Sequence, residues 1–273
     1  MCGSFTLLSM AACGKFGFGL EAFDSSIHVE CADSEILDVL DRYIFPPLVR
    51  ATTERSSPDI FLRVDRSAEG FAVFVNDELA AAATDLHDGV RAAVKALDDA
   101  VVHRMKMFRA VHAGAVLIDG SALLLPGSSH AGKSSLVAEM LRRGASCFSD
   151  EYALLDHKGW VHSYPRPLLL RNGRPRQSLF LPEDLGSTYA VGAAPVGWIF
   201  ALDYVSSGAW DVHEIEKAEA VMLLLRNTPH EMAISPAMVD FFLHTAAHAV
   251  CYAGQRCEVA EAATHVLKLI RGT

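Results

Sequence analysis

The sequence lacks paired cysteines, a long apolar run and a basic region, and each absence excludes a class of protein. None of its six cysteines forms a C-x-x-C pair, which favours free thiols in a reducing cytoplasm over a disulfide scaffold. No apolar run reaches the roughly 20 residues that a membrane-spanning helix needs. The net charge is −9 and Lys and Arg form no stripe, so we expect neither nucleic acid nor an anionic membrane as a partner.

The chain is long enough for a large domain with a smaller companion. It has 273 residues, 51% of them hydrophobic, and shows neither an internal repeat nor a low-complexity segment. Met1-Cys2-Gly3-Ser4 has no basic n-region and no A-x-A-like site after an apolar core, so we expect no signal peptide. We predict a small N-terminal α+β subdomain over residues 1–104 and a larger α/β domain with a mixed sheet over residues 105–273.

The first subdomain shows periodicity but no chemical signature. Four segments carry the pattern: strands across Phe16–Cys31, a helix over Ser34–Phe45 with Ser34 as N-cap, a hairpin over Pro58–Asn76, and a long helix over Asp85–Lys106. We interpret this half as a scaffold or a substrate-docking subdomain.

The most informative stretch is a glycine-rich segment that fits G-x-x-x-x-G-K-[ST], the Walker A or P-loop motif. Strand-like residues precede it, and a helix predicted over Ser135–Arg143 follows it. Such a loop turns backbone amides toward an anion at a helix N-terminus, while its Lys reaches the β- and γ-phosphates and its hydroxyl ligates Mg²⁺. We therefore predict that ATP binds to Gly127, Ser128, Ser129, His130, Ala131, Gly132, Lys133, Ser134 and Ser135.

An acidic pair follows the next predicted strand, Ala145–Phe148. We expect this strand beside the strand before the P-loop, with Asp150 and Glu151 at its end facing the γ-phosphate. One carboxylate would accept a proton from the attacking hydroxyl, and the other would hold Mg²⁺ together with Ser134. A solvated turn is the alternative interpretation. His112 precedes the same region, at the head of the strand pair 111–118 and 121–125.

At these residues the chain resembles the HPr kinase/phosphorylase family, both its catalytic domain and the shorter HPr-kinase-related proteins. The resemblance spans residues 111–156 and is carried by Val111-His112-Ala113-Gly114, the P-loop and Ser149-Asp150-Glu151. It implies a fold like that of phosphoenolpyruvate carboxykinase and transfer of the ATP γ-phosphate to a serine hydroxyl. It also implies Asp150 as general base, His112 as its polar partner, Glu151 as a metal ligand and Arg166 as the transition-state arginine.

The departures from the family pattern bear on the substrate. Ser135 stands where the family commonly has Glu, Glu151 replaces the second Asp, and the C-terminal loop that binds HPr has no clear counterpart. The resemblance therefore does not establish phosphorylase activity or HPr as the substrate. The shorter relatives include kinases encoded with peptide-modifying systems, such as those that phosphorylate the terminal serine of lasso-peptide precursors, which implies a protein or peptide substrate.

Two further clusters allow alternatives. A basic segment could clamp a phosphate or carboxylate, or lie solvated; its members are Arg166, Arg171, Arg174 and Arg176. His244 and His248 are four residues apart in a helix predicted over Met238–Tyr252, with Cys251 and Cys257 beyond. We favour a packed core helix there over zinc, because no recognised ligand spacing completes the set.

The sequence thus predicts an α/β kinase that uses ATP and Mg²⁺ to phosphorylate a serine hydroxyl of a protein or peptide. Two alternatives stay open: a kinase of a small-molecule alcohol, and a nucleotide-binding regulator without catalysis. The acceptor, the reverse reaction and the assembly of the chain into a homo-oligomer are not determined by the sequence.

Overall fold

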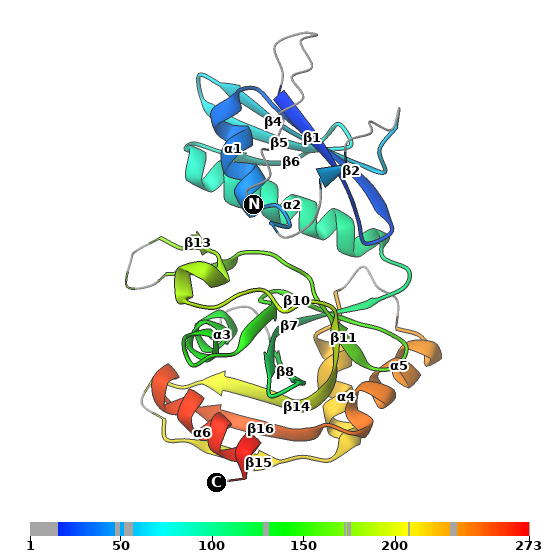
Figure 1. Cartoon of the computed structure of the whole chain (residues 1–273), viewed down its shortest axis with the longest axis vertical. Coiled ribbons are helices and arrows are strands. Elements are labelled where there is room, and N and C mark those ends of the chain that lie inside the picture. Colours follow the sequence, from blue (N-terminus) through cyan, green and yellow to red (C-terminus); the bar gives the residue numbers. More distant parts are fainter. Residues whose placement is uncertain are drawn as a thin grey trace, which may run out of the picture. The chain divides into compact units, whose positions relative to one another are not determined.

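The structure is a computed structural model that describes residues 16–46, 50–51, 57–127, 131–171, 173, 176–206, 208–229 and 234–272. The chain divides into two compact units, residues 1–106 and 107–273. Both units combine a mixed sheet with helices (Figure 1). No helix within the described part is long and apolar enough to cross a membrane. The described cysteines Cys31, Cys147, Cys251 and Cys257 are free and buried.

The first unit is a six-stranded sheet that packs against two helices. Its strands run in the order β3-β1-β2-β4-β5-β6, and only β2 and β4, which α1 connects, are parallel. The elements are β1 Phe16–Ala22, β2 Ser25–Cys31, α1 Ser34–Tyr43, β3 Arg50–Ala51, β4 Ile60–Ser67, β5 Gly70–Val75, β6 Glu78–Ala83 and α2 Leu86–Arg104.

The predicted elements of this unit are confirmed, apart from a different N-cap and two strands, β3 and β6, that were not expected. The α1 N-cap is Asp33 and not Ser34, because the Asp33 carboxylate accepts the amide hydrogen of Ile36 at 3.0 Å. Strand β6 was not expected, since its alanine run 80–83 carries no strand periodicity. It forms because β5 offers a free edge next to the tight turn at Asn76 and Asp77, whose φ angles are 49° and 64°.

The second unit is built around a sheet in the order β11-β10-β7-β8-β14-β16-β15, with β9 paired to β7. Because β11 also pairs with β14, the strands from β11 to β14 close into a ring. The strands are β7 Arg109–Ile118, β8 Ser121–Pro126, β9 Ser146–Ser149, β10 Tyr152–Leu155, β11 Trp160–His162, β14 Ala193–Tyr204, β15 Asp211–Glu214 and β16 Val250–Arg256.

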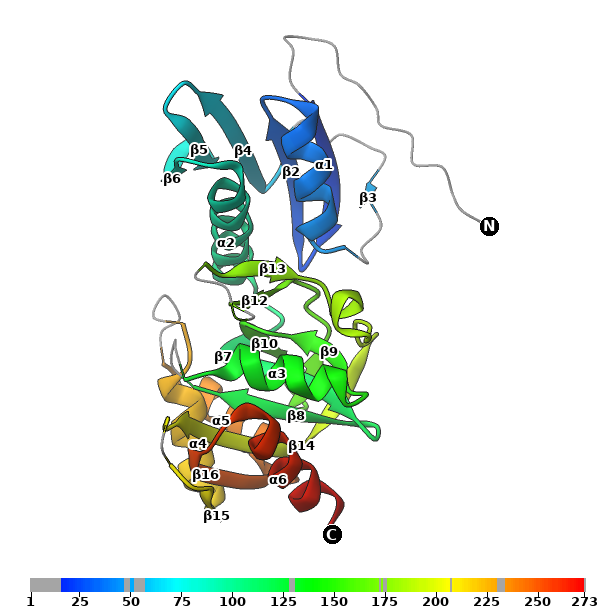
Figure 2. The same ribbon diagram turned by 90° about the vertical axis from the view of Figure 1, so that its left-hand side faces the viewer.

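Helices cover both faces of this sheet (Figures 1 and 2). Helices α3 and α6 share one buried core, and α4 and α5 share the other. A separate two-stranded sheet, β12–β13, lies between β11 and a 3-10 turn in the chain. These elements are α3 Lys133–Arg142, β12 Leu168–Leu170, β13 Ser178–Phe180, the 3-10 turn η1 Pro182–Leu185, α4 Lys217–Arg226, α5 Pro236–Ala247 and α6 Val259–Arg271.

The helix predicted over Met238–Tyr252 is wrong at its C-terminal end. Helix α5 ends at Ala247, and residues 250–256 form β16, which pairs in parallel with β14 and antiparallel with β15. The short apolar run fits either element by sequence alone. These residues form a strand because β14 and β15 supply backbone hydrogen-bond partners on both of its sides.

Strands β8, β14 and β16 are parallel neighbours, so their carboxyl ends lie at the same edge of the sheet. They end at Pro126, Tyr204 and Arg256. In open α/β sheets this edge is where ligands bind. The edge therefore marks the place to look for a site.

Candidate functional site

The glycine-rich residues 127–135, called the 127–135 segment below, connect β8 to α3. Ser128, Ser129 and His130 lie outside the described residues. At the start of the segment the Gly127 amide donates to the His112 carbonyl oxygen at 3.3 Å, which ties it to β7. Helix α3 begins at Lys133, two residues before the predicted start. Lys133, Ser134 and Ser135 therefore form the first turn, where backbone amides have no partner inside the helix.

Gly132 is needed at the entry to this helix. Its φ of 78° lies in the left-handed region, and a Cβ at this position would collide with Nη2 of Arg256. The local backbone therefore requires the second glycine of the motif. The carbonyl oxygen of Gly132 accepts the Leu136 amide at 3.2 Å and so starts the hydrogen-bond ladder of α3.

Lys133 is half-buried and folds back over the segment. Its Nζ donates to the Gly127 carbonyl oxygen at 2.7 Å. Burial lowers the pKa of Lys133, while the carboxylates of Glu151 and Asp150 act in the opposite direction. The structure thus places Lys133 within electrostatic reach of the acidic pair that the sequence singled out.

Asp150 is buried, with 2% of its surface exposed, directly after β9. Oδ2 accepts the Leu169 amide at 3.4 Å, and Oδ1 has no hydrogen-bond partner of good geometry among the described residues. The pKa of Asp150 is raised to about 6, mainly by burial and in part by nearby Glu151, whereas Ser134, Arg166 and the Leu169 amide favour the ionised form. A solvated turn does not describe this side chain.

Glu151 and His112 form the exposed side of the same group. Oε1 of Glu151 lies 3.7 Å from Nδ1 of His112, and the His112 ring contacts Tyr152, its cross-strand neighbour, at 4.6 Å between centroids. The Glu151 side chain is 40% exposed, so it borders solvent where Asp150 does not. The two acids therefore differ in environment, and environment decides which one can act as a base near neutral pH.

The expected position of the acidic pair in the sheet needs a correction. Strands β9 and β10, which flank Asp150 and Glu151, pair with β7 and not with β8. Strand β7 thus separates them from the strand that leads into the 127–135 segment. The groups still meet, because the start of α3 turns back over β7, where Val137 packs against Gly114.

Of the four arginines in the basic segment, Arg166 is the one that the structure relates to this group. Burial raises the pKa of Asp150 and of the Tyr189 hydroxyl, and the Arg166 charge partly opposes the rise in both. Arg171 and Arg176 are exposed, and Arg174 lies outside the described residues. Among the described arginines of this segment, Arg166 is partly buried near Asp150, whereas the other two are exposed.

The structure adds one residue that the sequence did not indicate, Arg256 at the end of β16. It is 3% exposed, and its Nη2 and Nη1 donate to the carbonyl oxygens of Gly132 at 3.1 Å and Cys257 at 3.0 Å. Its guanidinium lies over the Tyr204 ring, with Cζ 4.9 Å from the centroid. A small pocket lies between the 127–135 segment and the strand ends, lined in part by Pro126, Lys133, Phe200 and Arg256.

The histidine and cysteine cluster does not gather on one helix. His244 lies in α5 and bonds the Asp240 carbonyl through Nδ1 at 2.8 Å, whereas His248 is the C-cap residue. Cys251 is buried in β16 and Cys257 follows that strand. Both cysteines lie outside α5, so the helical spacing of the two histidines does not continue to them.

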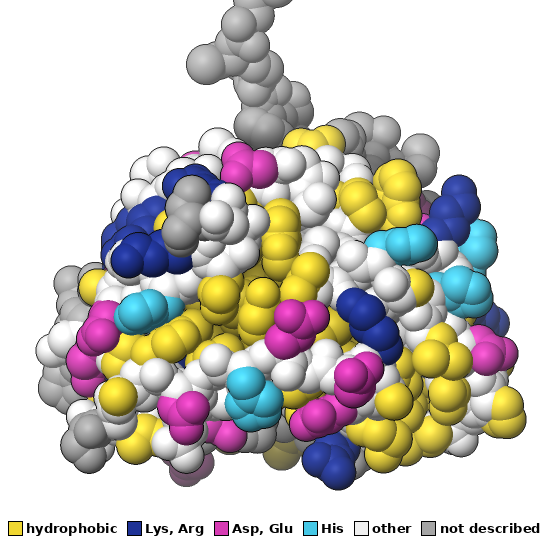
Figure 3. Space-filling model, turned by 90° about the horizontal axis from the view of Figure 1, so that it is seen from below, with side chains coloured by type: hydrophobic (Ala, Val, Ile, Leu, Met, Phe, Trp, Pro, Cys, Tyr) yellow, Lys and Arg dark blue, Asp and Glu magenta, His cyan; other side chains and the backbone are white. Residues whose placement is uncertain are grey.

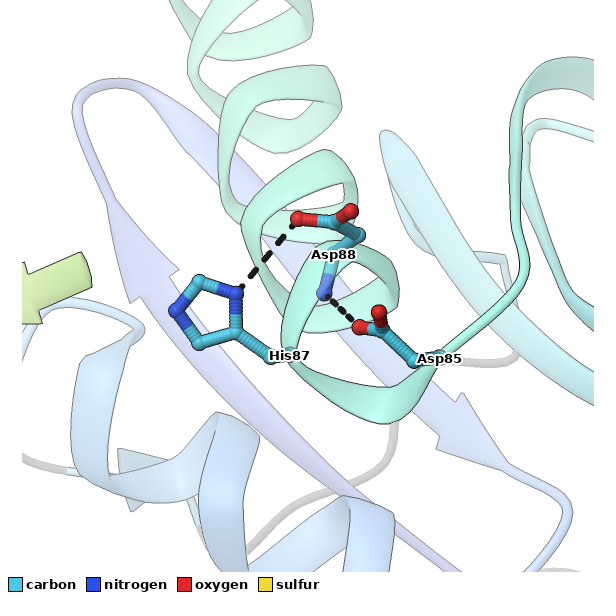
Figure 4. Close-up of side chains that lie close together, drawn as sticks. All are labelled: Asp85, His87 and Asp88. Carbon is cyan, nitrogen blue, oxygen red and sulfur yellow. Dashed lines mark hydrogen bonds and ion pairs between the residues drawn. The ribbon is translucent and has the colours of Figure 1, made fainter. Parts of the chain in front are cut away.

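A different group brings possible metal ligands together at the start of α2. Asp85, His87 and Asp88 have ligand atoms within 4.8 Å of one another (Figure 4). The Asp85 carboxylate accepts the Asp88 amide at 2.9 Å, and His87 Nδ1 lies 3.4 Å from Asp88. This is the N-cap of an amphipathic helix, which explains the acids without an ion.

On the face drawn in Figure 3, the described side chains do not gather into one large charged patch. Lys and Arg side chains lie on it in small separate groups, interspersed with acidic, histidine and hydrophobic side chains. The convergence of buried and charged groups around Lys133, Asp150 and Arg256 remains the candidate site. Its parts can hold an anion at a helix N-terminus and offer a carboxylate that changes charge near neutral pH.

No family model and no curated protein matches the chain. Among solved structures, the HPr(Ser) kinase/phosphatase from Coxiella burnetii is similar over 60% of this chain and 95% of that chain, with 14% sequence identity and a TM-score of 0.35. The similarity is distant and at the level of the fold only.

Proposed function

We propose that the chain is a kinase that uses Mg-ATP to phosphorylate a serine hydroxyl of a protein or peptide, with the 127–135 segment as its P-loop. The observation that carries the proposal is the placement of Asp150. A buried carboxyl with a pKa of about 6 lies beside Ser134, the hydroxyl residue of the G-K-S motif. A general base works best when its pKa is near the working pH.

The residues around the P-loop fit ATP and Mg²⁺. The first turn of α3 offers backbone amides, which have no partner within the helix, and the positive end of the helix dipole to phosphate oxygens. Lys133 supplies a point charge that now rests on the Gly127 carbonyl and can turn to a phosphate. The Ser134 hydroxyl and the Glu151 carboxylate are the oxygen donors that Mg²⁺ prefers. When bound, the ion would neutralise charge on the β- and γ-phosphates.

The transfer then needs only a few groups of the chain. The serine Oγ forms a bond to the γ-phosphorus, the bond from that phosphorus to the bridging oxygen of ADP breaks, and the serine proton passes to Oδ1 of Asp150. Arg166 stabilises charge on the transferred group. His112 orients Glu151 across their 3.7 Å contact. Positioning and charge neutralisation account for most of the catalysis of phosphoryl transfer.

The acceptor class comes from the resemblance to HPr-kinase-related proteins. Those that act in peptide modification phosphorylate a serine at a chain end, which an open site can admit more easily than a serine within a folded protein. The partly exposed side of the site, at Glu151 and His112, offers such an entrance. The proposed partner is therefore an unfolded peptide with an accessible serine.

The test is transfer of label from [γ-³²P]ATP into a lysate fractionated by size, followed by phosphoamino-acid analysis. We expect labelled phosphoserine in the peptide fraction, lost with Asp150→Asn and retained with Asp59→Asn, a surface aspartate of the first unit. Label in the metabolite fraction would point to a small-molecule alcohol. Tight ATP binding with no transfer to any fraction would show a nucleotide-binding regulator instead.

A further inference from the structure

We infer that Tyr204, at the carboxyl end of β14, forms a stacking platform for the nucleotide base. The inference rests on the proposed nucleotide site and names a part of it that the motif residues do not provide. A P-loop binds phosphates, which all nucleoside triphosphates and inorganic polyphosphates share. Preference for a nucleotide needs a second set of residues.

The location follows from the topology. Strands β8, β14 and β16 run in parallel and end at one edge, where β8 leads into the P-loop. Tyr204 and Arg256 are paired at the ends of the other two strands. A Cβ placed on Gly132 would come within 3.7 Å of the Tyr204 Cβ, so the platform adjoins the start of α3 directly. A base there remains within reach of phosphates on the first helical turn.

The chemistry of this corner fits a flat, polar-edged ring. Arg256 lies over one face of the Tyr204 ring, and the residue is still 41% exposed, which leaves aromatic surface for a second planar group. Arg256 is held by the Gly132 and Cys257 carbonyls and keeps the ring in place. Glu258 accepts the Tyr204 hydroxyl at 2.6 Å and has acceptor capacity left for a base amine or ribose hydroxyl.

Two details favour a ligand platform over a merely structural contact. The Tyr204 residue borders solvent beside the start of α3, the helix into which the P-loop leads. Arg256, in contrast, is almost fully buried and contacts the Gly132 carbonyl itself. We therefore assign the ring to the base, and Arg256 to the positioning of both the ring and the loop.

The experiment compares two triphosphate ligands, of which only ATP carries a nucleoside. The Kd values of ATP and of inorganic tripolyphosphate, each with Mg²⁺, are measured by calorimetry for the wild type, Tyr204→Leu and Tyr204→Phe. Loss of base stacking on an aromatic ring typically weakens binding by about tenfold or more. We expect this loss for ATP with Tyr204→Leu, no loss for tripolyphosphate, and near-normal values for both ligands with Tyr204→Phe.

Trp160→Leu is the matched control, because Trp160 is also 41% exposed but lies on β11, away from this edge. Unchanged ATP binding in Tyr204→Leu would overturn the platform and leave the P-loop intact. Equal weakening of both ligands would overturn it too, since the tyrosine would then act on the loop. If the wild type binds ATP no more tightly than tripolyphosphate, the protein has no base site. Binding of neither ligand would refute the proposed function itself.

Discussion

Asp59 in the first unit and Asp150 in the second are aspartates that the fold treats in opposite ways. Asp59 lies at the surface, accepts the Ser26 amide at 2.9 Å and the Ser26 hydroxyl at 3.0 Å, and pairs with Arg104 at 2.8 Å. These contacts, the Ser26 amide first, hold the pKa of Asp59 below its usual value. Asp150 is buried, and burial raises its pKa to about 6.

The difference shows how the fold places these two aspartates. In the first unit, Asp33 and Asp85 cap helices, and Asp59 binds Ser26 and Arg104, contacts that favour its ionised form. In the second unit, burial of the Asp150 carboxyl disfavours its ionised form, at a cost to stability above about pH 4. A strained or costly group that persists beside charged neighbours is a mark of a functional site. The comparison therefore supports the proposal that the chemistry lies in the second unit.

The largest effect is expected from Lys133→Ala compared with Lys95→Ala. Lys133 faces the proposed phosphates, whereas Lys95 makes an exposed pair with Asp99 on α2 at 2.7 Å. Removal of one donor that stabilises the transition state typically costs about 10²–10³-fold in kcat. We expect Lys133→Ala to lose at least that much and to bind ATP weakly, with Lys95→Ala unaffected. Unchanged turnover in a folded Lys133→Ala protein would remove the basis of the P-loop assignment.

The next effect separates the two aspartates directly. Asp150→Asn keeps the shape but removes the basicity, so we expect kcat to fall about 10²-fold, near the low end of general-base contributions. ATP affinity should change little or rise, because repulsion from the γ-phosphate is relieved. Asp59→Asn should retain wild-type kcat. If Asp150→Asn instead lost ATP binding with its fold intact, the residue would belong to the metal site.

The partner carboxylate gives a smaller and different response. Glu151 is the more exposed acid and is proposed to hold Mg²⁺, so the Glu151→Gln defect should shrink as Mg²⁺ is raised. The Asp150→Asn defect should not respond. Phosphoryl transfer titrated against Mg²⁺ on both variants measures this. Equal rescue of the two variants would mean that the roles of base and metal ligand are not divided between them.

Much of this site could be foreseen from local sequence, because its parts are local. The strand, glycine segment and helix occupy consecutive residues, and the acidic pair follows one strand later. The burial of Asp150 could not be foreseen, since it depends on the segment that returns over β9, where the Tyr164 amide donates to the Phe148 carbonyl at 3.0 Å. Local sequence at Ser149–Glu151 is equally compatible with a solvated turn.

Arg256 was missed for a related reason. The residues before it fit a helix as well as a strand, so no pattern placed position 256 at a strand end. Its contact with Gly132 joins residues 124 apart in sequence. The order β9-β7-β8 was missed in the same way, because pairing between strands is set by the whole sheet and not by the strands themselves. The N-terminal unit was easier, since its hairpins pair neighbouring segments.

The last prediction concerns stability, where the two aspartates should respond to pH with different signs in different ranges. Asp150 has a folded-state pKa of about 6 and a usual value of 3.8. Between these values the folded chain binds more protons than the unfolded chain, so stability falls as pH rises through this range. The difference corresponds to something on the order of 3 kcal/mol at most. Asp150→Asn has no such proton, so its stability should exceed the wild type's increasingly from about pH 4 to about pH 6.

Asp59 works in the other direction, because its folded pKa lies below 3.8. Its contribution is fully present above that value and is lost only as the pH falls further. Asp59→Asn should therefore be slightly less stable than the wild type by a constant amount across pH 4.5–7.

The tryptophans allow the two units to be followed separately. All three tryptophans, Trp160, Trp198 and Trp210, lie in the second unit, so their fluorescence in urea reports that unit, and far-UV circular dichroism reports both. We expect the Asp150→Asn gain in fluorescence-detected unfolding and the Asp59→Asn loss only in circular dichroism. A flat Asp150→Asn difference between pH 4 and 7 would mean that the carboxyl is not held protonated by burial. It would then be as ordinary as Asp59, and the contrast between the two units would no longer identify a site.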